Sequence, residues 1–146
     1  IRLGISLSDL YKKLATYPVK GAYVFLDACF SGGYKSAAPL LAQKGVRVVP
    51  KVGLPQGNTL SFSSSSGDQT SSVYHEKKQG YYTYFLIKTI RDAKGNISMK
   101  ELFDRTSAAV KRATALIDKI QEPQCMASPT WIGWEDIKLE TPVVTP

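Results

Sequence analysis

The sequence predicts an α/β protein, part of a three-layer α/β/α sandwich in which helices cover both faces of a mostly parallel sheet. Helix-like and strand-like patterns alternate along the chain, in the order helix, strand, helix, strand, strand, helix, helix. The 146 residues, 43% hydrophobic and 21% charged, suffice for one domain with its own core. A short apolar run also ends in a glycine-containing turn, which is typical of the sites in open α/β sheets.

The first two predicted elements are a helix and a strand. Residues 7–14 carry apolar side chains at helical spacing, and Ser6 or Ser8 can cap this helix. Residues 22–26 read Ala-Tyr-Val-Phe-Leu, a short apolar run with aromatic and β-branched side chains. Such a run favours a buried strand over a helix.

A cysteine follows this strand directly. Residues 24–33 read Val-Phe-Leu-Asp-Ala-Cys-Phe-Ser-Gly-Gly, so Cys29 is expected at the carboxyl end of a central strand. A thiolate there would lie at a crevice, and the following glycines allow a turn whose backbone N–H groups can face an oxyanion. The alternative is a core residue, because a lone cysteine in a strand is usually buried.

The middle of the chain holds a helix, a strand and a serine run. Residues 36–44 can form a short helix, 46–49 are a short apolar run, and 59–63 alternate apolar and polar side chains as a strand does. The serines at 63–66 could be a flexible linker, but a linker is not expected between two strongly patterned elements. Small side chains suit instead a groove in which an extended peptide lies against the backbone.

The second half of the chain is dominated by two helices. Residues 71–80 are polar and are predicted to form a surface loop, and 81–90 are predicted to form a strongly apolar helix. The next helix runs to about residue 120, with Ser98 as its cap and Glu101 completing a capping box.

The C-terminal part is predicted to be less regular. Pro123 ends the long helix, residues 130–139 are expected to form a strand or an ordered hairpin, and 141–146 resemble a tail. Because the chain has no start methionine, we expect it to begin within a longer protein.

Three motifs resemble those of the caspase-like cysteine peptidases, especially the metacaspases and their bacterial relatives. Residues 27–32, Asp-Ala-Cys-Phe-Ser-Gly, are similar to the nucleophile motif of that family. Residues 66–71, Ser-Gly-Asp-Gln-Thr-Ser, resemble a metacaspase segment that ends in Asp-Gln-Thr-Ser. Residues 80–86, Gly-Tyr-Tyr-Thr-Tyr-Phe-Leu, resemble a helix of the bacterial members. The order and spacing of all three agree, and the resemblance covers residues 6–123.

The resemblance implies a fold and an activity. The fold is the caspase–haemoglobinase architecture, with residues 1–140 as the C-terminal part of a caspase-like peptidase domain and 141–146 as the tail. The activity is that of a cysteine endopeptidase with Cys29 as its nucleophile. Relatives often cut themselves into two chains that stay associated, so the implied partner is an N-terminal chain of the same precursor.

The catalytic base is not evident in this chain. The resemblance places the histidine before the cysteine, in a Gly-His-Gly-type turn, and the single histidine here, His75, comes after Cys29. We therefore expect His75 to be a surface residue and the base to come from an absent N-terminal portion or chain. The alternative is a pseudo-peptidase, a non-catalytic interaction module.

Two acidic residues predict the substrate preference. Asp27 precedes Cys29 by two positions and shares its face of the strand, and Asp68 follows the next strand near the same crevice. Buried carboxylates require a cation, which an Arg or Lys side chain of a peptide substrate would supply. Metacaspase resemblance implies the same basic preference, and Ser66 in the expected groove completes the substrate site. Alternatively, Asp27 caps a nearby backbone group or pairs with an internal lysine.

Several other classes of protein are disfavoured. The net charge of +7 is spread over separate segments and forms no nucleic-acid motif. No apolar stretch is long enough for a membrane span. The two cysteines, Cys29 and Cys125, are expected to be free thiols without a zinc-ligand spacing. Some relatives need calcium, but the acidic residues form no recognisable calcium loop, so no cofactor is predicted.

Overall fold

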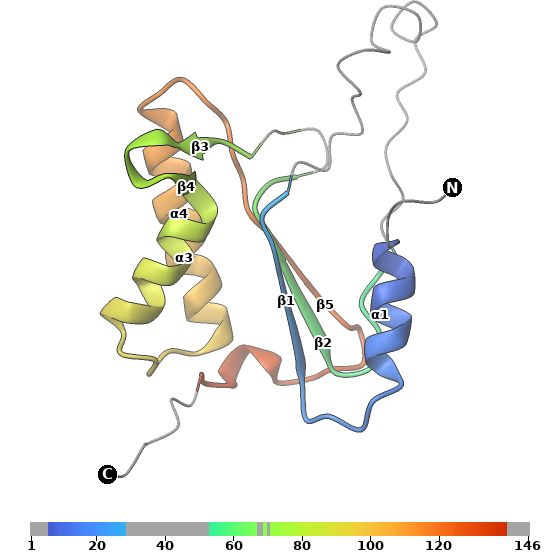
Figure 1. Ribbon diagram of the computed structural model, residues 1–146. Coiled ribbons are helices and arrows are strands. Elements are labelled where there is room, and N and C mark those ends of the chain that lie inside the picture. The colour runs from blue at the N-terminus through green and yellow to red at the C-terminus, as the bar shows by residue number, and fades with distance from the viewer. Residues whose placement is uncertain (1–5, 29–52, 67–68, 70, 140–146) are drawn as a thin grey trace, which may run out of the picture.

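The computed structural model describes residues 6–28, 53–66, 69 and 71–139. The helix expected at 36–44, the apolar run at 46–49 and the tail at 141–146 lie outside the described residues. Figure 1 shows a central sheet with one helix on one side and a pair of helices on the other. The described part is therefore a mixed α/β fold, as the alternating sequence patterns predict.

The central sheet has the strand order β1-β2-β5. β1 (Ala22–Leu26) runs parallel to β2 (Thr59–Ser63), and β5 (Gln124–Ala127) runs antiparallel to β2. Because β5 begins opposite Ser63, where β2 ends, it has to run back along β2. One parallel and one antiparallel pair do not confirm the expectation of a mostly parallel sheet.

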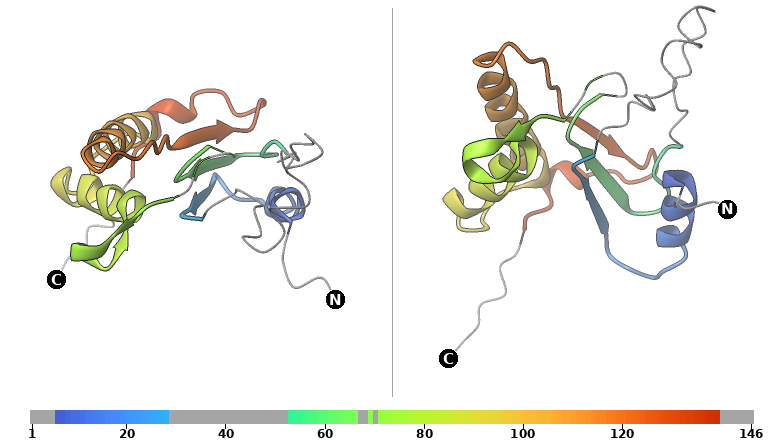
Figure 2. Two further views of the ribbon diagram at one scale, coloured as in Figure 1. Left: turned by 90° about the horizontal axis from the view of Figure 1, so that it is seen from above. Right: turned by 45° about the horizontal axis from the view of Figure 1, so that its top comes forward.

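Helices pack against both faces of β2, as the two views of Figure 2 also show. On one face, Leu60 and Phe62 belong to the main hydrophobic core. On the other face, the hydroxyl of Tyr11 in α1 (Leu7–Ala15) donates a hydrogen bond of 2.8 Å to Oγ of Ser61. The alternation of side chains along a strand explains how one strand serves two layers. A complete three-layer sandwich stays a prediction.

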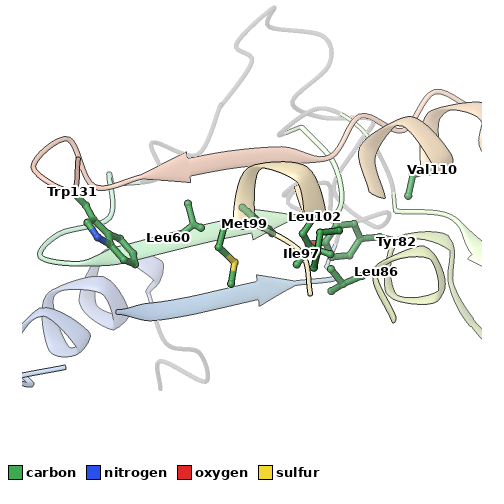
Figure 3. Packing of buried hydrophobic residues seen from close by; sticks show 9 residues of the cluster. Leu60, Tyr82, Leu86, Ile97, Met99, Leu102, Val110 and Trp131 are labelled. Atoms are coloured by element: carbon green, nitrogen blue, oxygen red, sulfur yellow. The ribbon is translucent and has the colours of Figure 1, made fainter. Parts of the chain in front are cut away.

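The main core lies between β2 and the hairpin of two helices, α3 (Tyr81–Asp92) and α4 (Met99–Ala115). Figure 3 shows its side chains converging from the sheet and from both helices. The buried members are Leu60, Phe62, Tyr82, Leu86, Ile97, Met99, Leu102, Val110 and Trp131. This core holds α3 against the sheet, which matters because α3 begins beside the end of β1.

The helix α4 begins where its sequence predicts and ends earlier. The side chain of Ser98 accepts a hydrogen bond of 3.2 Å from the backbone N–H of Glu101, which confirms the predicted cap. The helix ends at Ala115 rather than near residue 120. Asp118 adopts a left-handed conformation (φ 53°), and the next N–H turns back to the carbonyl of Thr114. Such a chain reversal commonly ends a helix.

The segment predicted as a surface loop contains a short hairpin. β3 (Val73–Tyr74) pairs antiparallel with β4 (Gln79–Gly80), and the 3-10 turn η1 (His75–Lys77) connects them. The ring of Tyr74 stacks on Tyr81, with centroids 4.5 Å apart. This contact with α3 explains the order of a segment whose polar sequence indicated only a loop.

The expectation that residues 130–139 form a strand or an ordered hairpin is wrong. This segment contains the 3-10 turn η2 (Trp134–Asp136) and an isolated bridge between Lys138 and Ser98. The side chain of Trp131 is buried in the main core, so packing against the sheet and α4 holds the segment in place. The last strand, β5, lies just after Pro123 instead.

Candidate active site

The predicted site residues are only partly within the described structure. Cys29, the expected nucleophile, and Asp68 lie outside the described residues, whereas Asp27 and Ser66 lie within them. β1 and β2 are parallel, so the segments that follow them leave the sheet at the same edge. On the segment after β1, the described part of the site ends at Ala28, the residue before the expected nucleophile.

Backbone contacts fix the chain that leads to Cys29. The N–H of Ser64 donates to the carbonyl of Leu26 at 2.9 Å, which extends the pairing of β1 and β2 by one step. The hydroxyl of Ser64 donates a hydrogen bond of 3.4 Å to the carbonyl oxygen of Ala28. The serine segment (residues 63–66) thus fixes the backbone that follows β1, as far as Ala28, the residue before Cys29.

The carboxylate of Asp27 joins three elements. Its Oδ1 accepts a hydrogen bond of 2.6 Å from Oγ of Ser71. Its Oδ2 accepts one of 2.6 Å from Oγ1 of Thr83 and a longer one of 3.3 Å from the Thr83 backbone N–H. The expectation that this carboxylate is buried is wrong, because Asp27 is exposed.

Asp27 also caps a helix. Thr83 is the third residue of α3, whose N-cap residue Gly80 has no side chain to satisfy the free N–H groups of the first turn. Asp27 supplies that acceptor from the end of β1. The absence of a Cβ is necessary here, because a Cβ at Gly80 would lie 3.0 Å from Cγ of Asp27. The alternative that Asp27 caps a nearby backbone group is therefore confirmed.

A buried glutamine holds the loops of the site together. Gln121, of which 1% is exposed, donates from Nε2 to the carbonyl of Ser64 (2.9 Å) and to Oγ of Ser71 (3.4 Å). Its Oε1 accepts the N–H of Ser72 at 2.9 Å. Since Ser71 donates to Asp27, the glutamine sets the position of the group that orients the carboxylate. Sequence reasoning missed Gln121, because a glutamine is usually exposed, and here the apolar neighbour Ile120 is 76% exposed while Gln121 is buried.

The serine run is an ordered part of the fold. Ser63, Ser64 and Ser65 are buried, and Oγ of Ser65 donates to the carbonyl of Gln69 at 3.3 Å. The rejection of a flexible linker is confirmed. The expected groove, in which an extended peptide lies against the backbone of this run, does not include these three residues, because they are buried. Ser66 is partly exposed, and its role in substrate binding stays a prediction.

The only histidine of the chain lies in the turn of the β3–β4 hairpin. His75 is exposed and begins the η1 turn of the hairpin, as expected for a surface residue. Its carbonyl accepts the N–H of Lys78, which closes that turn. Among the described residues, no hydrogen bond or ion pair connects the His75 imidazole to Asp27.

The second cysteine is a structural residue. Cys125 is a free, half-buried thiol on β5, opposite Phe62 of β2. Burial raises the pKa of Cys125 to about 12, and the negative charges of Asp104 and Glu135 add to the effect. Burial likewise raises the pKa of the Tyr82 phenol, and the negative charge of Asp27 adds to the effect. Both groups stay protonated at neutral pH.

We expect iodoacetamide at pH 7.5 to leave Cys125 unmodified in the folded protein and to modify it after unfolding in urea. With a pKa of about 12, roughly one thiol in 10⁴ to 10⁵ is a thiolate at this pH. Mass spectrometry of the digested protein measures the alkylated fraction. Rapid alkylation of Cys125 in the folded state would contradict its assignment as a half-buried thiol that stays protonated.

Neither a metal site nor a membrane span emerges from the described residues. Across residues 6–28, 53–66, 69 and 71–139, no three His, Cys, Asp or Glu side chains gather as ligands for a metal ion. Within the same ranges, no helix combines the length and apolar character needed to cross a membrane.

Comparison with known proteins identifies the family. A family model described as the caspase domain matches residues 2–130, which is most of the chain. No match is found among the curated proteins. The match covers the strand that leads to Cys29, the serine segment, the helical hairpin and β5. The chain therefore belongs to the caspase domain family, a family of cysteine peptidases.

Proposed function

We propose that this chain is the nucleophile-bearing, C-terminal part of a metacaspase-like endopeptidase that cleaves after Arg or Lys. The observation that carries the proposal is the carboxylate of Asp27, which is exposed yet held in place at the end of β1. It lies two residues before Cys29 in the chain. No lysine or arginine of the described residues pairs with it, so its charge is available to a substrate cation.

The proposed reaction uses Cys29 as the nucleophile. A histidine takes the proton of the thiol, and the sulfur then attacks the carbonyl carbon of the peptide bond. The negative oxygen that forms is stabilised by backbone N–H groups, of which that of Cys29 is one candidate. The histidine returns the proton to the departing amine, which leaves an acyl-enzyme. A water molecule then adds to the acyl carbon, and the sulfur leaves as the thiol.

The basic side chain of the substrate would be held by Asp27. An ammonium or guanidinium group forms a charge-assisted hydrogen bond to a carboxylate, which is stronger than a bond between neutral groups. Ser71 and Thr83 orient the carboxylate before the substrate arrives, so little ordering cost remains for binding. Asp68 and Ser66, on the segment after β2, are proposed to border the same site.

The catalytic histidine is proposed to come from an N-terminal chain of the same precursor. β1 lies at one edge of the β1-β2-β5 sheet, and among the described residues it pairs only with β2. Two of its aromatic side chains, Tyr23 and Phe25, are 36% and 39% exposed. An edge strand with exposed aromatic residues is the kind of surface that another segment covers. A strand added there would pair with β1, the strand that precedes Cys29 in the chain.

A second candidate function is a non-catalytic pseudo-peptidase. The observation that favours it is the position of His75, the single histidine of the chain, on an exposed hairpin turn. This protein would still bind a basic peptide through Asp27, but its cysteine would not be activated. The two candidates therefore differ in the reactivity of Cys29.

A labelling experiment separates the two candidates. The full-length protein is treated with a short peptide that ends in arginine and carries a thiol-reactive group at its carboxyl end. We expect one equivalent to be incorporated, and peptide mapping to find it on Cys29. The matched control is the same reagent ending in glutamate, which the negative Asp27 should exclude. Labelling of Cys29 by the arginine reagent no faster than that of an ordinary unactivated thiol, or labelling of Cys125 alone, would rule out the peptidase and leave the interaction module.

A further inference from the structure

The hydrogen bonds to Asp27 are distributed unevenly over its two oxygens. Oδ1 accepts one, from the hydroxyl of Ser71, whereas Oδ2 accepts two, from the hydroxyl and the N–H of Thr83. Each oxygen of a carboxylate has two lone pairs. Oδ2 is therefore fully occupied from within the protein, and Oδ1 retains one acceptor position.

The start of α3 also restricts access to Oδ2. A Cβ atom added to Gly80 would collide with Oδ2, while it would lie 3.2 Å from Oδ1. The backbone of Gly80 thus lies directly against the Oδ2 side of the carboxylate. Because Asp27 as a whole is exposed, the side that remains open to a substrate is that of Oδ1.

These two observations bear on the choice between arginine and lysine. A guanidinium group binds a carboxylate best as a fork, with one N–H to each oxygen, whereas an ammonium group is a point charge that needs one oxygen. A carboxylate with one open acceptor position can therefore satisfy lysine fully and arginine only in part.

We propose that Thr83 is a specificity-determining residue, which confines the substrate cation to Oδ1 and so lowers the preference for arginine over lysine. The proposal rests on the proposed function, in which Asp27 binds the basic side chain of the substrate. Thr83 acts through Asp27 and need not touch the substrate.

The test is the ratio of kcat/KM for two peptides that differ only in Arg or Lys at the cleavage position, measured on the full-length protein. Thr83→Ala removes the hydroxyl together with the space that it fills beside Oδ2, and it keeps the backbone N–H. It frees an acceptor position on Oδ2, so we expect the Arg-to-Lys ratio to rise about five- to tenfold. Both peptides are measured on one preparation, so a partly unfolded sample does not change the ratio.

Two control variants sharpen the test. Thr83→Ser keeps the hydroxyl, so it should keep the ratio of the unmodified protein. Ser71→Ala removes the donor to Oδ1 and opens nothing on Oδ2, so it should change both rates by a similar factor.

The possible failures are distinguishable. An unchanged ratio in Thr83→Ala, with both peptides still cleaved, would overturn the role of Thr83 and leave the proposed function standing. A ratio that rises equally in Ser71→Ala would also overturn it, because any loosening of Asp27 would then have the same effect. If the unmodified protein cleaves neither peptide, the proposed function fails and this inference fails with it.

Discussion

Replacing Cys29 with alanine is expected to abolish cleavage of a peptide with arginine at the cleavage position. The acyl-enzyme requires a bond to sulfur, and loss of a nucleophile typically lowers kcat by about 10⁴-fold or more. The fold should persist, because the change removes a single side-chain atom. Initial rates measure the first effect, and thermal unfolding followed by circular dichroism measures the second, with a Tm change within about 3 °C.

The matched control is Cys125→Ala, which removes the other thiol of the chain. Cys125 lies half-buried on β5 with a raised pKa, so it takes no part in the proposed reaction. We expect kcat/KM to stay within about twofold of the unmodified protein, at a cost of about 1 kcal/mol in the free energy of unfolding. Activity that survives in Cys29→Ala and disappears in Cys125→Ala would reverse the assignment of the nucleophile.

Asp27→Ala is expected to have two separate effects, because the carboxylate has two roles, one toward the substrate and one as the cap of α3. Loss of its charge should lower kcat/KM for an arginine peptide by about 100-fold, in line with the loss of one member of a charge pair. Loss of its acceptor atoms leaves the Thr83 N–H uncapped, which should lower the free energy of unfolding by about 1–2 kcal/mol. Steady-state kinetics and urea unfolding measure the two effects independently.

Asp27→Asn separates the two roles. The amide keeps an oxygen that can cap α3, but it carries no charge for the substrate. We expect stability closer to that of the unmodified protein, together with a loss of activity similar to that in Asp27→Ala. If Asp27→Asn cleaves arginine peptides normally, then Asp27 serves only as a helix cap and the basic substrate preference has another source.

The elements with strong local patterns could be predicted from the sequence. The short apolar run of β1, the alternation in β2 and the apolar stripe of α3 each match the observed element closely. The start of α4 was also predictable, because Ser98 forms its cap with residues next to it in the chain. In these segments the local preference and the tertiary structure agree.

The shorter elements could not be predicted in the same way. The hairpin of β3 and β4 has two residues in each strand, and its order depends on the stacking of Tyr74 on a helix. The η2 turn occupies a segment expected to be a strand, because the burial of Trp131 places it against the core. Such contacts join residues far apart in the chain, so no window of sequence contains them.

From the sequence alone came the family resemblance, the strand that leads to Cys29 and the choice of Asp27 as a site residue, since each depends on neighbouring positions. Only the tertiary structure decided how Asp27 is held. Its partners Ser71 and Thr83 lie 44 and 56 residues away, and the buried Gln121 lies 50 residues beyond Ser71. Hydrogen bonds between distant segments exist only after the sheet and the helical hairpin have packed together. They nevertheless determine which oxygen of the carboxylate remains open to a substrate.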